Sequence, residues 1–410
     1  SSLEHLPETI SELVNLRTLK VGQNRETPIP RYVGDFPKLR ELKISQRGMK
    51  RIPDFMLDLP LTTLTLKYCD LERLPEDWGN LSELESLELQ RDRFSPAEYA
   101  KLGMLDELRS LSLREMKGSM DLSALASLSN LEELNLDEND LTSLPFELEQ
   151  LKDLKKLELR INKFNTFPSV VFEFPRLEYL SLINSDLSSI PAEIGTLAKI
   201  EELNLTSNPI STFPSEMVEM ESLTKLSAKR IDISSFPPTL LELSNLHQLD
   251  LSYNGLQKIP SAIGQLGNLK RLKLINNRIP DLPRELANLE SLEVLQLYAN
   301  PLNRFPQALR SLKSLRWLNL ENCNVSEVPP WIGEIQSLEV LELSSNPFSQ
   351  IPSQISSLKN LNVLALPQME TLPESIGALT SLTDLQFSLK EDSTLPLNFR
   401  NLARLQYVYP

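Results

Sequence analysis

The chain has 410 residues, of which 24% are charged and 40% hydrophobic, a composition typical of an ordered soluble protein. Its net charge of -14 argues against nucleic acid as the main partner, because phosphate binding needs a basic face. No apolar run approaches the roughly 18 residues of a membrane span, so we expect no membrane insertion. Two cysteines cannot make a disulfide framework, and they favour a reducing, intracellular compartment.

A Leu-x-x-Leu-x-Leu pattern recurs along the whole chain. Its first residue, Leu or Ile, falls at positions 16, 39, 61, 84, 108, 131, 154, 177, 200, 223, 246, 269, 292, 315, 338, 361, 382 and 405. From 108 to 361 every step is 23 residues, and a fixed period of this length is typical of a solenoid. The central Leu-x-Leu has the two-residue alternation of a strand with one buried face. Each unit therefore predicts one strand, and stacked units bury their leucines against one another.

A second fixed position follows each strand. Eight residues after the third leucine of most units, an apolar residue precedes a proline, as in Ile259-Pro260 and Val328-Pro329. Proline fixes φ and donates no hydrogen bond, which suits a loop that leaves a strand. The next segment, "SAIGQL" in residues 261–266, predicts a short helical or 3-10 turn on the side opposite the strand.

These motifs resemble the leucine-rich-repeat family over essentially the whole chain. The unit reads LPxxIxxLxxLxxLxLxxNxL, as in "IPSAIGQLGNLKRLKLINNRI" of residues 259–279. It is similar to the 23-residue repeats of Scribble-type scaffolds, plant intracellular Ras-group proteins and many bacterial proteins. The resemblance implies an α/β leucine-rich-repeat solenoid, a curved horseshoe with a parallel β-sheet on the concave face and short helical or 3-10 segments on the convex face. We expect residues 1–410 to form a single domain of about 18 repeats, which can be a fragment of a longer protein.

Three steps in chain order depart from the period. The step from 39 to 61 is 22 residues, the step from 84 to 108 is 24, and the step from 361 to 382 is 21. Near the second, Ser95, Pro96 and Glu98 predict the N-cap, first position and capping-box acid of a longer helix. The favoured interpretation of all three is a tolerated change in length, and the alternative is a docking site.

Three residues after the third leucine, many units carry the same polar residue. It is Asn at positions 24, 139, 162, 208, 254, 277, 300 and 346, whereas Cys69 and Cys323 occupy this position in two other units. In the family this Asn faces inward and binds the backbone of neighbouring turns, and an amide suits that role because it both donates and accepts. Cysteine tolerates burial. We therefore interpret both cysteines as buried structural groups rather than reactive thiols.

The chain carries little that could catalyse a reaction. Its two histidines, His5 and His247, lie near neither cysteine in the stack, and no phosphate loop, Cys-x-x-Cys or His-Glu-x-x-His motif occurs. The acidic residues between Glu132 and Asp140 could hold a metal ion, but a solvated charged face is the favoured interpretation. We expect no enzyme activity, no cofactor and no metal site.

Two features of the strand faces point to a partner, since repeat arrays usually bind through the concave side. Apolar residues recur there in successive units, and exposed apolar patches containing Trp or Tyr tend to mark interaction sites. Basic residues also recur there on an acidic chain, which suits an acidic protein or peptide. The candidate partner-binding residues are Ile275, Val294, Tyr298, Trp317, Val340, Val363, Lys229, Arg271 and Lys273. The alternatives are the ordinary strand preference of β-branched residues and a solvated face of mixed charge.

The sequence therefore predicts a protein–protein interaction scaffold or recognition domain that binds a protein or peptide on its concave face. The alternative is a substrate-targeting domain of a larger enzyme, such as a bacterial effector or ubiquitin ligase, whose catalytic domain lies outside this chain. A third, less favoured interpretation is a sensor of a small ligand. We expect a cytoplasmic location, or, for an effector, delivery into a host cell.

Overall fold

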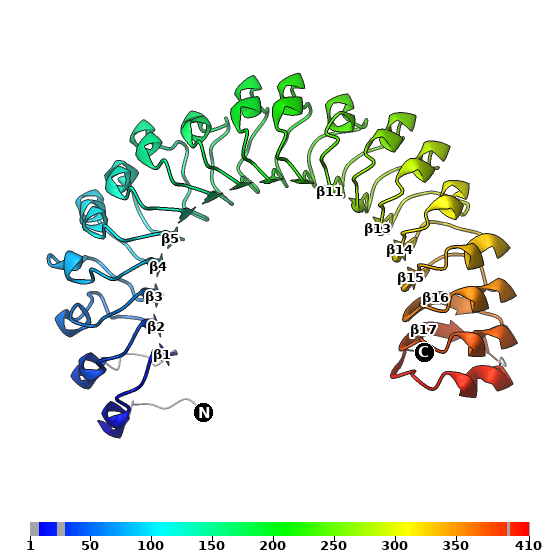
Figure 1. The fold of residues 1–410 in the computed structure, drawn as a ribbon, viewed down its shortest axis with the longest axis horizontal. Coiled ribbons are helices and arrows are strands. Elements are labelled where there is room, and N and C mark those ends of the chain that lie inside the picture. The colour runs from blue at the N-terminus through cyan, green and yellow to red at the C-terminus, as the bar shows by residue number, and fades with distance from the viewer. Residues whose placement is uncertain (1–7, 23–28, 392–393, 410) are drawn as a thin grey trace. The chain divides into compact units, whose positions relative to one another are not determined.

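The computed structural model describes residues 8–22, 29–391 and 394–409. These residues form two compact units, which are described separately: unit 1 spans 1–187 and 196–200, and unit 2 spans 188–195 and 201–410. Within each unit, every repeat contributes one strand and one 3-10 helix, with the strands lying side by side and the helices on the opposite side (Figure 1). We call these faces the strand side and the helix side.

Unit 1 contains eight strands and eight 3-10 helices among its described residues. The strands are β1 (Thr18–Val21), β2 (Glu41–Ser45), β3 (Thr63–Lys67), β4 (Ser86–Gln90), β5 (Ser110–Arg114), β6 (Glu133–Asn135), β7 (Lys156–Glu158) and β8 (Tyr179–Ser181). The helices are η1 (Glu8–Glu12), η2 (Arg31–Asp35), η3 (Asp54–Met56), η4 (Trp78–Asn80), η5 (Pro96–Met104), η6 (Leu122–Ser127), η7 (Phe146–Gln150) and η8 (Ser169–Glu173).

Unit 2 has the same plan, and its first helix ends at the boundary with unit 1. The strands are β9 (Glu202–Asn204), β10 (Lys225–Ser227), β11 (Gln248–Asp250), β12 (Arg271–Lys273), β13 (Val294–Gln296), β14 (Trp317–Asn319), β15 (Val340–Glu342), β16 (Val363–Met369), β17 (Asp384–Leu389) and β18 (Tyr407–Tyr409). The helices are η9 (Ala192–Thr196), η10 (Ser215–Glu219), η11 (Pro238–Leu241), η12 (Ser261–Gln265), η13 (Arg284–Asn288), η14 (Gln307–Ser311), η15 (Pro330–Glu334), η16 (Ser353–Ser357), η17 (Glu374–Ala378) and η18 (Leu397–Asn401).

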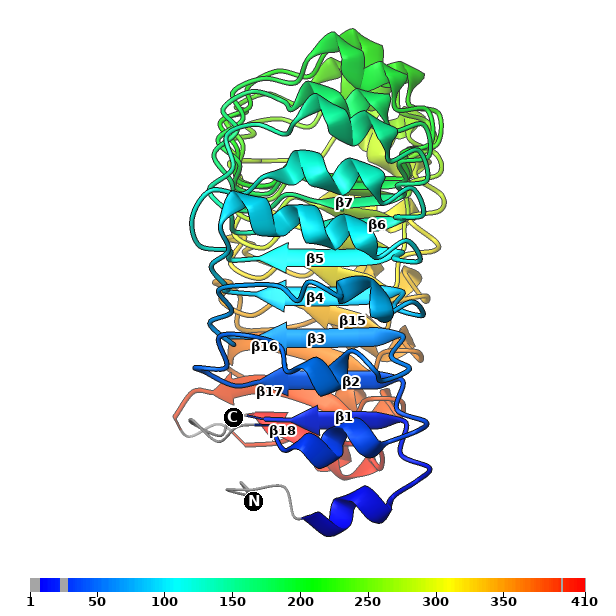
Figure 2. The same cartoon turned by 90° about the vertical axis from the view of Figure 1, so that its left-hand side faces the viewer.

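Neighbouring strands within each unit are parallel and stay in the register of the repeat. In unit 1, β1 to β7 stack one above another and point the same way (Figure 2). In unit 2, Leu249 pairs with Leu272, which pairs in turn with Leu295. All three leucines are almost fully buried, as the alternation predicts. Because each strand is offset by one repeat, residues at the same repeat position form columns across the sheet.

Proline and glycine shape the helix side as the repeat predicts. Pro260 lies in the extended region, with φ -72 and ψ 155, directly before η12, and the turn that follows is a 3-10 helix. A Cβ built on Gly264 would stand 2.6 Å from the carbonyl oxygen of Glu285, and one on Gly333 would stand 2.5 Å from that of Gln354. Real Cβ atoms do not approach so closely, so glycine at these positions allows successive helices to pack together.

The helix predicted at the 24-residue step forms as η5, but its capping differs from the prediction. Ser95 is the N-cap and Pro96 the first helical residue, yet the Ser95 side chain makes no capping hydrogen bond. The capping box is therefore wrong: Glu98 instead accepts a hydrogen bond from the Leu74 backbone N–H at 2.8 Å and pairs with Lys101 at 2.9 Å. Glu98 therefore links two neighbouring repeats and does not cap its own helix.

The buried polar ladder forms as predicted wherever the structure describes it; Asn24 lies outside the described residues. Asn162 is representative, because its Nδ2 donates to the carbonyls of Leu136 and Leu159, both at 3.0 Å. Its Oδ1 accepts from the backbone N–H groups of Asn139 at 3.2 Å and Leu141 at 2.9 Å. One amide thus satisfies four buried backbone groups from two repeats, which an apolar side chain would leave unpaired.

Asp92 occupies the same rung in its repeat, three residues after Leu89, and is fully buried. Its Oδ1 accepts from the Leu71 backbone N–H at 2.8 Å, as the amide oxygen does at other rungs. Its Oδ2 has no hydrogen-bond partner. Burial raises the pKa of this carboxyl to about 7, with the nearby Asp70 adding to the effect. A carboxyl therefore takes the place of the amide at this rung.

A left-handed backbone conformation recurs one residue before each rung. Asn276 adopts φ 52 there, a conformation that asparagine tolerates, but Ile161 adopts φ 54 although it is β-branched. The Ile161 side chain is 44% exposed, so little packing compensates for the strain. We expect Ile161→Asn to raise the free energy of unfolding by about 1 kcal/mol and Asn276→Ile to lower it by a similar amount, measured by urea denaturation. Equal stabilities of Ile161→Asn and the wild type would contradict the strain.

Candidate partner-binding surface

The predicted apolar column forms on the strand side of unit 2. Arg271, Val294, Trp317, Val340 and Val363 pair in succession at the first position of strands β12 to β16. A second column runs parallel to it, two residues further along each strand, through Lys273, Gln296, Asn319 and Glu342. The sheet therefore brings together basic residues on β12 and apolar residues on β13 to β16.

Trp317 is the most exposed of the predicted apolar residues, with 37% of its surface accessible. Its indole Nε1 donates to Glu342 Oε2 at 2.9 Å, and Asn319 Nδ2 donates to the same oxygen at 2.6 Å. These contacts fix the direction in which the indole ring lies across β14 and β15. An aromatic ring held in one orientation loses little entropy when a partner covers it.

The other apolar candidates surround Trp317 at different depths. Val294 is buried at 8% exposure, whereas Val340, Val363, Ile275 and Tyr298 are half-buried. The accessible apolar surface, which we call the Trp317 patch, therefore consists of Trp317 with the half-buried Ile275, Tyr298, Val340 and Val363, whereas Val294 is covered.

Lys229, Arg271 and Lys273 differ from most basic residues on the strand sides. None of the three forms an ion pair with any residue that the structure describes. Other basic residues are neutralised across the sheet, as Lys225 is by Glu202 at 3.1 Å. Arg271 and Lys273 line a shallow depression of about 80 Å³ together with residues of β9 to β11, among them the basic Lys225 and the acidic Glu202 and Asp250. Asp250 is the neighbour of Lys273 on the adjacent strand β11, but the two form no ion pair. These three basic side chains therefore have no direct ion-pair partner among the described residues, on a chain of net charge -14.

Two acidic residues lie at the opposite edge of the Trp317 patch, and the sequence patterns did not single them out. Glu342 accepts the indole hydrogen bond, and Glu321 lies close enough that the negative charge of Glu342, together with burial, raises the Glu321 pKa. Their repeat positions alone carry no signal, because acidic residues occur at strand-side positions throughout the chain. The patch is thus bounded by unpaired positive charge on one side and by negative charge on the other.

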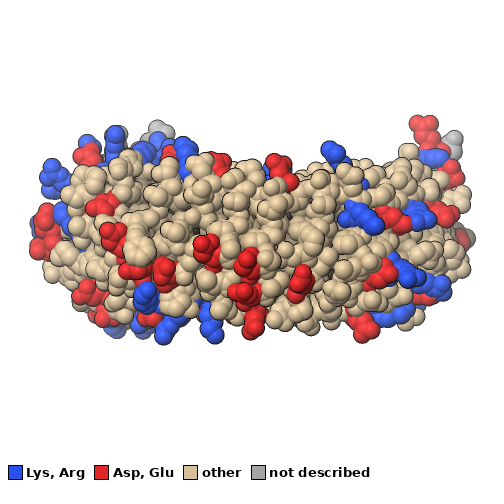
Figure 3. Space-filling view, turned by 90° about the horizontal axis from the view of Figure 1, so that it is seen from above, with Lys and Arg blue, Asp and Glu red and all other residues tan. Residues whose placement is uncertain are grey.

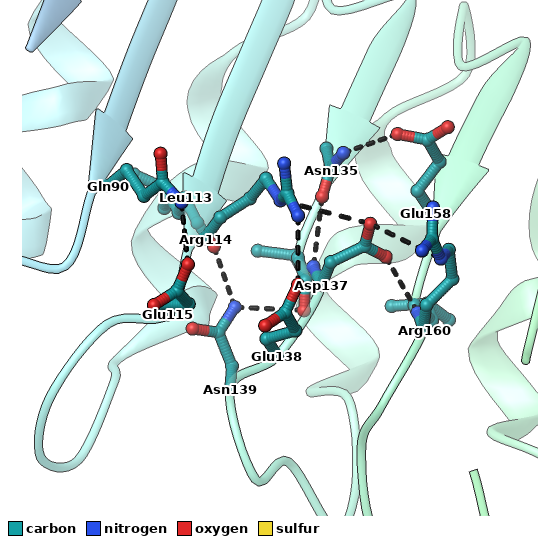
Figure 4. Close-up of polar contacts among 12 residues, drawn as sticks. Gln90, Leu113, Arg114, Glu115, Asn135, Asp137, Glu138, Asn139, Glu158 and Arg160 are labelled. Atoms are coloured by element: carbon teal, nitrogen blue, oxygen red, sulfur yellow. Dashed lines mark hydrogen bonds and ion pairs between the residues drawn. The ribbon is translucent and has the colours of Figure 1, made fainter. Parts of the chain in front are cut away.

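In unit 1 the charges beside β5, β6 and β7 are paired with one another instead. Asp137 is buried between two arginines: the Arg160 backbone N–H donates to its Oδ1 at 2.7 Å, while Arg114 Nε and Arg160 Nε lie 4.0 and 3.9 Å from its Oδ2 (Figure 4). Arg114 also pairs with Glu138 at 2.9 Å. Burial raises the pKa of Asp137, and the two guanidinium groups oppose that effect.

The acidic band between Glu132 and Asp140 is likewise paired rather than gathered around a vacant centre. Glu132 contacts Arg109 at 2.9 Å and Lys155 at 2.6 Å, and Asp140 contacts Lys163 at 2.7 Å. No group of three potential metal ligands exists among the described residues. On the helix side, acidic and basic side chains are scattered between broad neutral areas (Figure 3).

Both cysteines are buried, unpaired members of the ladder, as predicted. Cys323 Sγ lies 3.1 Å from the Leu297 carbonyl oxygen, and the Cys323 backbone N–H donates to Asn346 Oδ1 at 3.2 Å. Burial raises the pKa of Cys323 to about 11 and that of Cys69 to about 12, so little thiolate is present at neutral pH.

We therefore expect slow labelling of both thiols in the folded protein and rapid labelling after denaturation, followed by mass spectrometry at pH 7.5. Labelling of Cys323 at the rate of a free thiol in the folded protein would contradict its burial.

Comparison with known proteins identifies the family. A model of the leucine-rich-repeat region matches residues 2–135, 111–227, 226–316 and 302–408. The chain therefore belongs to the leucine-rich-repeat family. A search among curated proteins finds no match to the sequence. Among the described residues, no helix has the length and apolar character needed to span a membrane.

Solved structures of other repeat proteins resemble this chain closely in fold. A leucine-rich-repeat protein of Leptospira interrogans is 27% identical, with a TM-score of 0.69 over 99% of this chain and 93% of that one. The ectodomain of the Arabidopsis receptor kinase HAESA, solved with an IDA peptide hormone, is 26% identical, with a TM-score of 0.60 over 92% and 71% of the two chains. TLR13, solved with a single-stranded RNA, is 23% identical with a TM-score of 0.72, over 99% of this chain and 62% of that one, and shows the fold alone.

Proposed function

We propose that this protein is a non-catalytic recognition domain whose protein or peptide partner binds the strand side of unit 2. The observation that carries the proposal is the juxtaposition of the Trp317 patch with Arg271 and Lys273 on β12, two strands away; Lys229, just after β10, is a third basic residue without an ion pair. An exposed aromatic anchor beside uncompensated charge is what protein interfaces use for affinity and for orientation. The peptide hormone bound to HAESA supports a partner of this class.

We place the domain in the cytoplasm and assign its function to the whole array of about 18 repeats in residues 1–410. Two buried, unpaired cysteines support a reducing compartment. The negative net charge supports a protein rather than a nucleic acid as the partner, because only a local part of the surface carries uncompensated positive charge.

The test is affinity capture with matched variants of the full chain. A strand-side variant combines Trp317→Ala with Arg271→Glu, and a control variant combines Phe146→Ala with Lys258→Glu. Phe146 is 59% exposed on η7, and Lys258 is exposed in the loop before η12, so the control makes the same chemical changes outside the patch. The proposal expects partners of the wild type to be retained by the control and lost by the strand-side variant. Retention by both would refute it.

A further inference from the structure

Charged and apolar residues follow a fixed order across the strands of the proposed surface, and this order limits which peptides can bind. Arg271 and Lys273 lie on β12, Trp317 lies two strands away on β14, and Glu342 lies on β15. Perpendicular to the strands, the first column runs from Arg271 to the apolar residues Trp317, Val340 and Val363. The second column runs from the positive Lys273 to the negative Glu342. A partner that matches all three has its charges in the opposite order.

The spacing between these features is set by the sheet. Adjacent strands lie about 4.8 Å apart, so Arg271 and Trp317, at the same position of β12 and β14, are separated by about 10 Å. A peptide in the extended polyproline II conformation advances about 3.1 Å per residue with three residues per turn, so its residues i and i+3 point to the same face about 9 Å apart. A side chain over Arg271 and a side chain over Trp317 therefore belong to residues i and i+3 of a peptide that crosses the strands.

We infer that the strand side of unit 2 takes an extended peptide segment with a carboxylate side chain over Arg271 and Lys273 and a large apolar side chain three residues away over Trp317. This inference rests on the proposed function and specifies its ligand. Trp317 and the half-buried Val340 contact the apolar side chain, while Arg271 and Lys273, lining the shallow depression, receive the carboxylate. Both cations are free of intramolecular partners among the described residues, so binding does not have to break an existing ion pair.

Glu342 and Glu321 disfavour a peptide whose acidic residue lies on the β15 side of its apolar residue. Glu342 holds the indole Nε1 at 2.9 Å, so its carboxylate faces the patch from the side of β15. A peptide carboxylate placed beyond Trp317 would approach Glu342 and Glu321, and like charges at such a distance disfavour binding. The surface therefore accepts an acidic residue on the β12 side of the apolar anchor and rejects one on the β15 side.

The experiment is selection of a random twelve-residue peptide library displayed on phage against the full chain. Enriched peptides are expected to carry Asp or Glu three positions from a large apolar residue. A synthetic peptide of the best clone is expected to lose at least tenfold in affinity with Arg271→Glu and with Trp317→Ala, but less than twofold with Lys258→Glu. Exchanging the peptide acid for Lys is expected to restore binding to a chain carrying Arg271→Glu and Lys273→Glu.

The outcomes separate this inference from the function on which it rests. Peptides that depend on Trp317 but carry no acid at this spacing, and that bind the Arg271→Glu variant normally, overturn the inference and leave the proposed function standing. Peptides that depend on neither Trp317 nor Arg271 overturn both. Absence of any enriched peptide overturns the inference, while the capture experiment still tests the proposed function.

Discussion

Asp92→Asn is expected to stabilise unit 1 by about 2–4 kcal/mol at pH 8 and to remove a pH dependence that the wild type shows between about pH 4 and 7. At the other rungs, the amide Nδ2 donates to carbonyls three and 26 residues earlier, as Asn139 does to Leu136 and Leu113. By the same spacing, the carbonyls of Leu89 and Leu66 are the acceptors that correspond to the Asp92 rung, and a carboxyl can donate to a carbonyl only when it is protonated. Ionised Asp92 keeps the Leu71 N–H on Oδ1 but leaves Oδ2 without a hydrogen-bond donor inside the stack.

The direction of the pKa shift determines how the free energy of unfolding changes with pH. The Asp92 pKa is raised from 3.8 to about 7 in the folded protein, so the folded state holds its proton more tightly than the unfolded chain. This contribution to stability is complete below about pH 4, is lost as the pH rises towards 7, and is then constant. At about 1.4 kcal/mol per pKa unit, the raised pKa sets an upper bound of about 4 kcal/mol.

The groups that face Asp92 explain why its charge is compensated only in part. Asp70 repels the ionised form, whereas Lys117 is the cation that favours it. Cys69 and Tyr99 have their own pKa values raised by burial and by the Asp92 charge, and the Tyr99 hydroxyl has no hydrogen-bond partner. The nearest groups are therefore neutral or acidic, apart from Lys117.

The measurement is urea denaturation of the wild type and Asp92→Asn at several pH values from 4 to 8.5. The difference between the two free energies of unfolding isolates Asp92 from the other carboxylates and should widen up to about pH 7. Asn139→Asp is the matched control, because it introduces a carboxyl at a rung now held by Asn; it should destabilise, increasingly so as the pH rises. A difference between wild type and Asp92→Asn that stays constant with pH would contradict a protonated rung.

Trp317→Ala is expected to weaken partner binding by about 2 kcal/mol or more, roughly a 30-fold loss, while lowering the free energy of unfolding by about 1 kcal/mol or less. The indole is 37% exposed and lies over β15, so its removal takes away the anchor of the patch. Because the ring is more than one-third exposed, its loss removes little buried apolar surface.

Two further variants separate ring area from the indole hydrogen bond and from general surface effects. Trp317→Phe keeps most of the ring but loses the contact with Glu342, so we expect it to retain binding within about threefold. Phe146→Ala removes an exposed aromatic ring from the helix side and should leave binding unchanged. Binding is measured by isothermal titration calorimetry with the selected peptide. A loss of several kcal/mol of stability in Trp317→Ala would show that Trp317 is a core residue.

The repeat period predicted most of the fold, because each position within the repeat has its own local backbone conformation. The leucine spacing predicted one strand around the central Leu-x-Leu of each unit, and β6 (Glu133–Asn135) is such a strand. The ladder position predicted the burial of both cysteines, and Asp92 could have been found by the same spacing from Leu89. Asp92 was not recognised as a buried ladder residue, because most acidic residues are exposed.

The details of the candidate surface depend on contacts between repeats, which a single repeat does not specify. Arg114 and Lys273 both follow the strand leucines and both point to the strand side. Arg114 forms an ion pair with Glu138, whereas Lys273 forms none with a described residue. The capping box at Ser95 failed for the same reason, since Glu98 binds the backbone of the preceding repeat. The direction of the Trp317 indole likewise depends on Glu342, one repeat further along.

Hydroxyl-radical footprinting of the protein alone and with the selected peptide bound tests the central claim most directly. The account predicts protection of Trp317 and Tyr298, with no change at Phe146 on the helix side. Protection of helix-side residues together with an unchanged Trp317 would contradict a partner on the strand side of unit 2.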